Sequence, residues 1–378
     1  MFEGRTIGSY KLKGCGAEWA GRVVQPQETP YSDQRLLQIY IKVESGGVLV
    51  PDPDQPKPLG GLPSGRGRKE LENGLRLFRA GAYAVIPVVF DTYPTKIFQG
   101  NPTEYVILGM DEGINERAKV LFESDLSSGK LMLNSSMISI MDSRGESYLQ
   151  GKQGLIALLC LCDVAEGFGI TLHTTHTAGE TIRFSGNSGN YSWNNITRRV
   201  FLHDLDSCLS VDDVDSSVIG LQKVLDLETA IFGLFDDYCR SRLDLITTPE
   251  QRMQNNLFRA FLRGYFRDEP ELRNEINRVA ELLQASFERA ILDLKTCHNS
   301  NDYSNWLRRT FGPSLTLSIV TLLMPIYARS SHSTAHPLPY GTDGFATQFR
   351  EFQMAQARLA AELSLQKRFV LPGWTSSR

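Results

Sequence analysis

Short runs of β-branched and aromatic residues dominate the first third of the chain and predict β-strands. Such runs occupy residues 36–43 (LLQIYIKV), 83–90 (YAVIPVVF) and 104–109 (EYVILG). Residues 50–67 follow the first run, and the prolines and glycines of PDPDQPKPLGG exclude a helix there. Leucine and phenylalanine at helical spacing then predict a helix over 69–80, ended by the glycine that comes next. The predicted order is strands, one helix, then strands.

From residue 115 onward, helical periodicity replaces this pattern. Residues 153–168 (QGLIALLCLCDVAEGF) are almost all apolar and predict a buried helix, whereas 199–202 predict one short strand. The spacing of apolar residues predicts further helices at 216–245, 250–267, 271–296, 313–327 and 345–367. The second part of the chain is therefore expected to be mainly helical.

These elements predict an α+β chain with two lobes. Residues 1–110 would form a small β-rich lobe with a Pro/Gly-rich insertion at about 44–67. Residues 111–378 would form a large α-helical lobe, and the glycines between 109 and 113 mark the expected hinge.

Composition and charge narrow the class of protein. The chain has 378 residues, of which 41% are hydrophobic and 22% charged, values typical of a globular protein. With 40 basic and 43 acidic residues the net charge is -3, too small for the long-range field of a general nucleic-acid or membrane-surface binder. The first residues, MFEGRTIGSYKLKG, contain no apolar segment typical of a signal peptide. We expect a cytoplasmic protein without a nucleic-acid or membrane partner.

The chain contains none of the short sequence motifs that mark nucleotide-binding loops, zinc proteases or serine hydrolases. Candidate site residues must therefore be sought among polar residues from several segments of the chain. Lys13 would end a short strand beside Gly14 and Gly16, whose missing side chains would let the backbone approach phosphates. Glu70, or alternatively Glu72, lies on the following helix and could pair with that lysine. A lysine–glutamate pair of this kind holds the ammonium group toward a nucleotide phosphate in kinase-type sites.

A second set of polar residues surrounds the strand at 199–202. Asn195 precedes this strand, and Asp204 and Asp206 follow it in the segment HDLD. An asparagine and an aspartate nine residues apart are suited to sharing a magnesium ion bound to nucleotide phosphates. The sequence therefore predicts Asn195, Asp204 and Asp206 as metal ligands.

Three short blocks resemble the selenoprotein O (YdiU-type) protein adenylyltransferases, which have a protein-kinase-like fold. The block LKGCG at 12–16 with Arg22 resembles the family's phosphate-binding lysine block, and Lys69-Glu70 resembles its helix pair. Asn195 and Asp204 match the spacing of its metal site. The resemblance implies a two-lobed protein-kinase-like fold, ATP and Mg²⁺ as cofactors, and transfer of AMP.

Two departures from this family bear on catalysis. The family's catalytic aspartate corresponds to Asn194, which cannot act as a carboxylate base. About 35 residues, Val23 to Lys57, are inserted between the lysine and glutamate blocks. This insertion allows an alternative closer to ordinary protein kinases, in which Lys42 of IYIK replaces Lys13 as the phosphate-binding lysine.

The function predicted is an ATP- and Mg²⁺-dependent transferase. Lys13, Glu70 and Asp204 are the expected catalytic residues, and AMP or a phosphoryl group would pass to a protein, peptide or small-molecule acceptor. One alternative is a catalytically weak pseudoenzyme of the same fold that binds nucleotides or proteins. Another is a zinc site at His173 and His176, completed by Cys160, Cys162 or His203.

Overall fold

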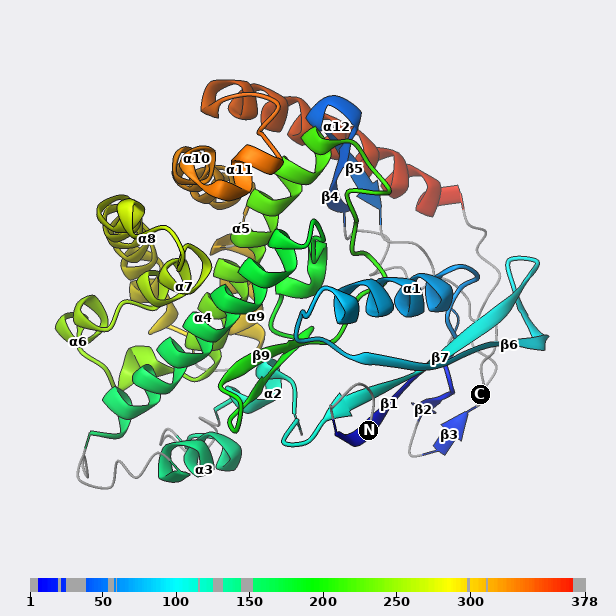
Figure 1. Ribbon diagram of the computed structural model, residues 1–378, viewed down its shortest axis with the longest axis horizontal. Helices are drawn as coiled ribbons and strands as arrows, with labels where there is room; N and C mark the ends of the chain where they lie inside the picture. The colour runs from blue at the N-terminus through cyan, green and yellow to red at the C-terminus, as the bar shows by residue number, and fades with distance from the viewer. Residues whose placement is uncertain are drawn as a thin grey trace.

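The protein is described by a computed structural model that covers residues 6–19, 22–24, 39–53, 58, 60–114, 116–124, 132–143, 152–297, 300–310 and 312–369. In these ranges the chain combines small antiparallel sheets with a larger helical part (Figure 1). The mixed α and β composition agrees with the prediction.

The largest sheet in the described ranges has three strands in the order β1-β7-β6. Strand β1 (Ile7–Lys13) pairs with β7 (Asn101–Asp111), which also pairs with β6 (Ile86–Phe98), and both pairings are antiparallel. Helix α1 (Arg66–Arg79) packs on this sheet, and its first residues contact Glu104 of β7. The carboxylate of Glu104 accepts hydrogen bonds from the amides of Gly65 and Gly67, both at 2.7 Å, and so caps the helix. The predicted helix at 69–80 is confirmed and starts three residues earlier.

Two hairpins lie between β1 and α1. The first joins β2 (Ala17–Trp19) to β3 (Arg22–Val24), and the second joins β4 (Ile39–Glu44) to β5 (Val48–Pro53). The predicted strand at 36–43 is thus confirmed from Ile39 onward, since 36–38 lie outside the described residues. Its placement differs from the expected one: β4 pairs only with β5 among the described strands and does not join the three-stranded sheet.

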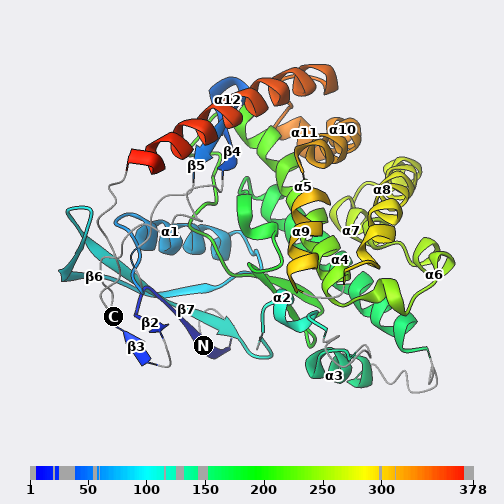
Figure 2. The ribbon, with the colours of Figure 1, turned by 180° about the vertical axis from the view of Figure 1, so that it is seen from behind.

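The β4–β5 hairpin packs against helices near the end of the chain. Both views show it next to α12 (Thr342–Phe369) and apart from β1, β6 and β7 (Figures 1 and 2). The hydroxyl of Tyr340 donates a 2.7 Å hydrogen bond to the carbonyl of Gly47, and Ser45 donates one of 2.7 Å to Asp215. A segment predicted as part of the β-rich lobe therefore forms a wall of the helical part.

Two long helices form the centre of the helical part, α4 (Gln153–Thr177) and α5 (Ser216–Arg240). Around them lie α2 (Ala118–Leu121), α3 (Ser135–Ser143), α6 (Pro249–Gln254), α7 (Leu257–Tyr265), α8 (Arg273–Leu294), α9 (Ser300–Thr310), α10 (Pro313–Arg329) and α11 (Ser331–Ala335). The predicted helix at 250–267 is interrupted because α6 ends at Gln254, and Asn256 caps α7 by accepting from the amide of Arg259 at 2.9 Å. Helices α2, α3, α9 and α11 were not predicted.

Helix α4 is apolar because it is enclosed by other helices. It is long and apolar enough to cross a membrane by length and composition, but 67% of its most apolar window is buried within the protein. Its contact with α7 depends on glycine: a Cβ at Gly169 would lie 2.2 Å from the carbonyl oxygen of Phe261. A Cβ at Gly264 would lie 2.2 Å from that of Glu166. The two backbones therefore touch where they cross, and α4 is a core helix.

Candidate functional site

Two segments that are far from β1 in the sequence converge on the ammonium group of Lys13. Its Nζ lies 2.5 Å from Oε2 of Glu70 on α1 and forms a second short contact with Oδ1 of Asp204. Asp204 follows strand β9 (Arg199–Leu202), and Oδ2 of Asp206 lies 3.7 Å from the same Nζ. The structure thus brings together four residues that the sequence analysis singled out separately.

The strand and the helix hold the segment HDLD by its backbone as well as by its charges. Alternation along β1 places Lys11 and Lys13 on one face, and Lys11 Nζ donates a 3.0 Å hydrogen bond to the carbonyl of His203. Oε1 of Glu70 accepts from the amide of Leu205 at 3.3 Å, and Asn73 Nδ2 donates to the carbonyl of that same residue. These bonds fix the segment that carries both aspartates.

Mutual charge keeps the cluster ionised despite its burial. Burial alone would lower the pKa of Lys13, but the carboxylates of Glu70, Asp204 and Asp206 outweigh it and raise that pKa above its ordinary value. Burial would raise the pKa of Asp204, yet Lys13 and Lys11 lower it to about 2. Burial raises the pKa of Glu70, and burial together with Lys13 lowers the pKa of Lys11 to about 8. At neutral pH the site therefore holds an ammonium cation beside an aspartate anion.

The carboxylates are close enough to share a metal ion. One oxygen each from Glu70, Asp204 and Asp206 lies within 4.8 Å of the others, and no other set of His, Cys, Asp or Glu in the described ranges meets this condition. Hard oxygen ligands suit Mg²⁺, which usually takes one or two protein carboxylates and otherwise binds water and phosphate. Arg66 Nη1 lies 3.3 Å from Asp206 and balances part of the negative charge. This donor set fits magnesium.

The structure separates Asn195 from these aspartates. Strand β8 (Tyr191–Asn194) and β9 form an antiparallel hairpin in which Asn194 faces Arg199 and Tyr191 faces Leu202. Asn195 lies in the turn at one end of this hairpin, whereas Asp204 comes after the other end. At about 3.3 Å per residue the two lie roughly 15 Å apart along the strands. The structure therefore does not bring Asn195 and Asp204 together.

Asn190 is the asparagine that lies at the same end of the hairpin as Asp204. It directly precedes β8, and its carbonyl accepts a 2.9 Å hydrogen bond from the amide of His203, which extends the hairpin ladder. Asn190, Asn187, Asp204 and Asp206 all line one cavity. The sequence analysis missed Asn190 because it did not predict that YSWN is a strand. Once β8 is paired with β9, the residue before β8 and the residue after β9 must be neighbours.

Asn194 stabilises the hairpin turn and does not occupy the place of a base. Its side chain is buried, and Nδ2 donates to the hydroxyl of Tyr83 at 2.7 Å and to the carbonyl of Glu112 at 2.9 Å. Its Oδ1 accepts from the amides of Ile196 and Thr197 at 2.9 and 3.1 Å. All four bonds are structural, so the identity of this residue says little about catalysis.

Changing Asn194 to Asp should therefore destabilise the protein and should not accelerate any reaction. The carboxylate would lose both donated hydrogen bonds and would face the carbonyl of Glu112, at a cost of about 1–3 kcal/mol. Urea denaturation measures this loss, and Asn195→Asp in the exposed turn should change stability less. Unchanged stability together with a faster reaction would contradict this role.

The remaining predicted nucleotide contacts have other roles. Gly14 adopts a φ of 81°, and a Cβ there would lie 2.5 Å from the carbonyl oxygen of Glu104, so this glycine serves a close turn. The amide of Gly16 donates a 2.8 Å hydrogen bond to the carbonyl of Gly60 and is not available to a phosphate.

Arg22 is on β3, but its side chain lies outside the described residues. Lys42 is exposed and pairs with Glu44 at 3.1 Å. The geometry therefore favours Lys13 over Lys42.

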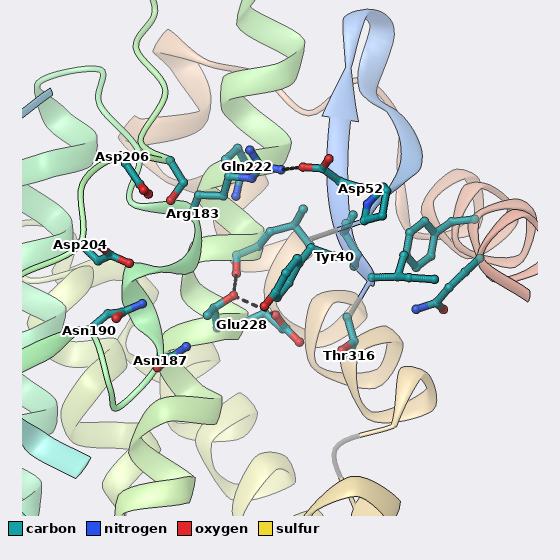
Figure 3. A pocket seen from close by; sticks show the side chains of 18 of the residues that line it. Tyr40, Asp52, Arg183, Asn187, Asn190, Asp204, Asp206, Gln222, Glu228 and Thr316 are labelled. Atoms are coloured by element: carbon teal, nitrogen blue, oxygen red, sulfur yellow. Dashed lines mark hydrogen bonds and ion pairs between the residues drawn. The ribbon is translucent and has the colours of Figure 1, made fainter. Parts of the chain in front are cut away.

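A cavity of about 700 Å³ extends from the charged cluster toward the β4–β5 hairpin (Figure 3). Its lining comes from β4, β5, α1, α5, α10, α12 and the loop between α4 and β8. Arg183 of that loop forms a 2.7 Å ion pair with Asp52 of β5 across the cavity wall. The insertion between the lysine and the glutamate thus helps to enclose the site.

His173, His176 and His332 lie together in a hydrogen-bonded cluster within the core. His173 and His176 lie within α4, and His332 is buried on α11 with Nε2 3.3 Å from Nδ1 of His173. His176 contacts the hydroxyl of Tyr265 at 2.8 Å and Asp226 at 3.1 Å. Within the described ranges no group of three or more possible metal ligands contains a histidine or a cysteine. The zinc alternative therefore has no structural support.

Asp226 of α5 supports the loop that carries the two cavity asparagines. Its Oδ2 accepts from the amide of Ile182 at 2.7 Å, and its Oδ1 accepts from Gln222 Nε2 at 2.9 Å. Burial raises the pKa of Asp226 to about 7, although these donors oppose the shift. The buried carboxylate thus anchors the start of residues 182–190 to the core.

Comparisons with known proteins leave the family open. No protein-family model matches the chain, and no curated protein sequence matches it. Among solved structures the chain is similar to WaaP in complex with acyl carrier protein, with 16% sequence identity over 69% of this chain and 90% of that one. The TM-score is 0.34, a level at which the likeness carries no argument about fold or function.

Proposed function

We propose that the protein is an ATP- and Mg²⁺-dependent transferase with a protein-kinase-like active site. The observation that carries this proposal is the double ion pair of Lys13, which joins Glu70 of α1 to Asp204 after β9. A strand lysine paired with a helix glutamate, together with an aspartate for the metal, is the arrangement that binds MgATP in protein kinases.

The order of the elements supports the same proposal. Kinases place the lysine on a strand, the glutamate on the next helix, and the two metal ligands on either side of a later hairpin. Here Lys13 ends β1, Glu70 lies on α1, and Asn190 and Asp204 flank β8 and β9. The two-lobed kinase-like fold and the more specific kinship with selenoprotein O are parts of this proposal.

Each residue has a defined task in the proposed site. Lys13 would bind a phosphate oxygen, and Glu70 would hold its ammonium group in place. Asp204 would bind the metal, with Asn190 and Asp206 as further oxygen ligands. Magnesium, when bound, would neutralise charge that develops on the phosphates. Because phosphoryl transfer depends mainly on positioning and electrostatics, this set could act without a strong base.

The test is calorimetry of ATP binding with and without magnesium. Wild-type protein should bind ATP in a magnesium-dependent manner, and Asp204→Ala should lose this binding because the metal loses a charged ligand. Lys42→Ala is the matched control, since this exposed lysine pairs only with the nearby Glu44 among the described residues and should leave affinity unchanged. Equal affinity of wild type and Asp204→Ala would overturn the metal assignment.

A nucleotide-binding pseudoenzyme is the second candidate. The loop from 183 to 190, RFSGNSGN, lies before β8 where kinases carry their catalytic aspartate, and it contains no acidic residue. Magnesium-dependent ATP binding without transfer to protein, peptide or small molecules would favour this candidate.

A further inference from the structure

One part of the cavity lies away from the charged cluster, and we call this part the chamber and define it by Tyr40, Gln222, Leu225, Glu228, Phe349 and Phe352. These residues come from β4, α5 and α12. Figure 3 shows Glu228 and Tyr40 pointing toward each other, with Asp204 and Asn190 apart from them. The chamber therefore adjoins the proposed nucleotide site without using its ligands.

Glu228 is a buried carboxylate without a cation. It is 6% exposed and receives hydrogen bonds from the hydroxyls of Thr229, at 3.3 Å, and Thr316. Within the described part of the chain no lysine, arginine or histidine lies within ion-pair distance of it. Burying an ionised carboxylate without a positive partner is costly, and such a group in a cavity wall favours a cationic ligand.

Gln222 adds to the cavity lining an acceptor oxygen that has no hydrogen-bond donor among the described residues. Its Nε2 donates to Asp226, but Oε1 is buried and accepts no hydrogen bond from the described residues. The side chain is 3% exposed and lines the same cavity. A buried carboxylate and a buried amide oxygen in the lining of one cavity favour a ligand with N–H donors.

Aromatic rings complete the wall and limit the class of ligand. Phe349 and Phe352 of α12 have ring centroids 5.8 Å apart, and Tyr40 lies on the hairpin next to that helix. Aromatic faces attract organic cations and also accommodate an apolar body. A hydrated metal ion would gain nothing from them, and an anion would be repelled by Glu228.

We infer that this chamber binds a small organic amine, with its ammonium group at Glu228 and its apolar body against Tyr40, Phe349 and Phe352. Its role as the acceptor of the transferred group rests on the proposed function, whereas binding itself does not. The hairpin insertion would then serve acceptor recognition.

The test compares phenethylamine with its neutral counterpart 2-phenylethanol by calorimetry, without ATP or magnesium. Phenethylamine should bind at least about tenfold more tightly, because only the amine can form a charged hydrogen bond with Glu228. Glu228→Gln keeps the shape and should abolish this preference. Glu351→Gln, which removes an exposed charge from α12, should preserve it.

A pH series on wild-type protein gives a readout that needs no variant. Burial raises the pKa of Glu228 to about 7, so below that pH a proton competes with the amine, and affinity should fall about tenfold per pH unit. The other charged groups lining the cavity are the Asp52–Arg183 pair and Arg66, Lys69, Asp204 and Asp206.

Equal binding of amine and alcohol, no binding of either, or a preference that survives Glu228→Gln would overturn the inference. None of these results would alter the magnesium-dependent ATP binding that tests the proposed function.

Discussion

Replacement of Lys13 by alanine is expected to lower the rate of transfer by about a hundredfold or more, as for the loss of a preorganised electrostatic contact. The ammonium group is held by Glu70 and Asp204 before any nucleotide arrives, so it needs no reorganisation to meet a phosphate oxygen. Without it, Glu70 can take up a proton, because burial already raises the pKa of this carboxyl group. The fold should therefore survive while transfer is lost.

Radiolabelled ATP measures both the rate and the group transferred. Label that reaches an acceptor only from the α position indicates AMP transfer, and label only from the γ position indicates phosphoryl transfer. Lys42→Ala should match wild type in either assay, because this side chain is exposed on β4. A Lys13→Ala variant as active as wild type would exclude the proposed site, and absence of both labels with intact ATP binding would favour the pseudoenzyme.

Local patterns were sufficient for elements whose boundaries are set by nearby residues. The helix at 69–80 was recognised because its apolar period stops before Gly81, which adopts a φ of 75° as a helix-ending glycine often does. The break between α6 and α7 was missed because the apolar spacing continues through Asn255 and Asn256. Only the cap formed by Asn256 distinguishes two helices from one.

In the candidate site, too, the residues that could be predicted are those marked by nearby sequence, whereas the others depend on contacts between distant segments. Lys13 and Asp204 could be selected because each is a charged residue at or just after the end of a strand, and Glu70 because it lies in the first part of the following helix. Asn195 was chosen in place of Asn190 because spacing alone cannot locate the turn of an unpredicted hairpin. The chamber at Glu228 was not foreseen, since it depends on β4 and β5 packing against α12, more than 290 residues later.

Removal of the Asp226 carboxylate should cause the largest loss of stability among the variants considered. Asp226→Ala would leave the buried donors of Ile182 and Gln222, and the ring nitrogen of His176, without their partner, and it should lower the free energy of unfolding by about 3 kcal/mol or more. Urea denaturation measures the loss. Asp212→Ala, an exposed aspartate just before α5, is the matched control and should change stability by less than about 0.5 kcal/mol. MgATP affinity should also fall, because the loop with Asn190 loses its anchor.

The isosteric variant Asp226→Asn separates the charge from the shape. Burial raises the pKa of Asp226 from 3.8 to about 7, so the folded protein holds this proton more tightly than the unfolded chain does. The resulting stabilisation is complete below about pH 4 and is lost as the pH rises through about 7. Asparagine has no proton to lose, so the stability difference between wild type and Asp226→Asn should be larger near about pH 5 than near about pH 8. A difference that does not vary with pH would mean that Asp226 stays ionised in the core, and that its hydrogen bonds to the loop outweigh the cost of burial.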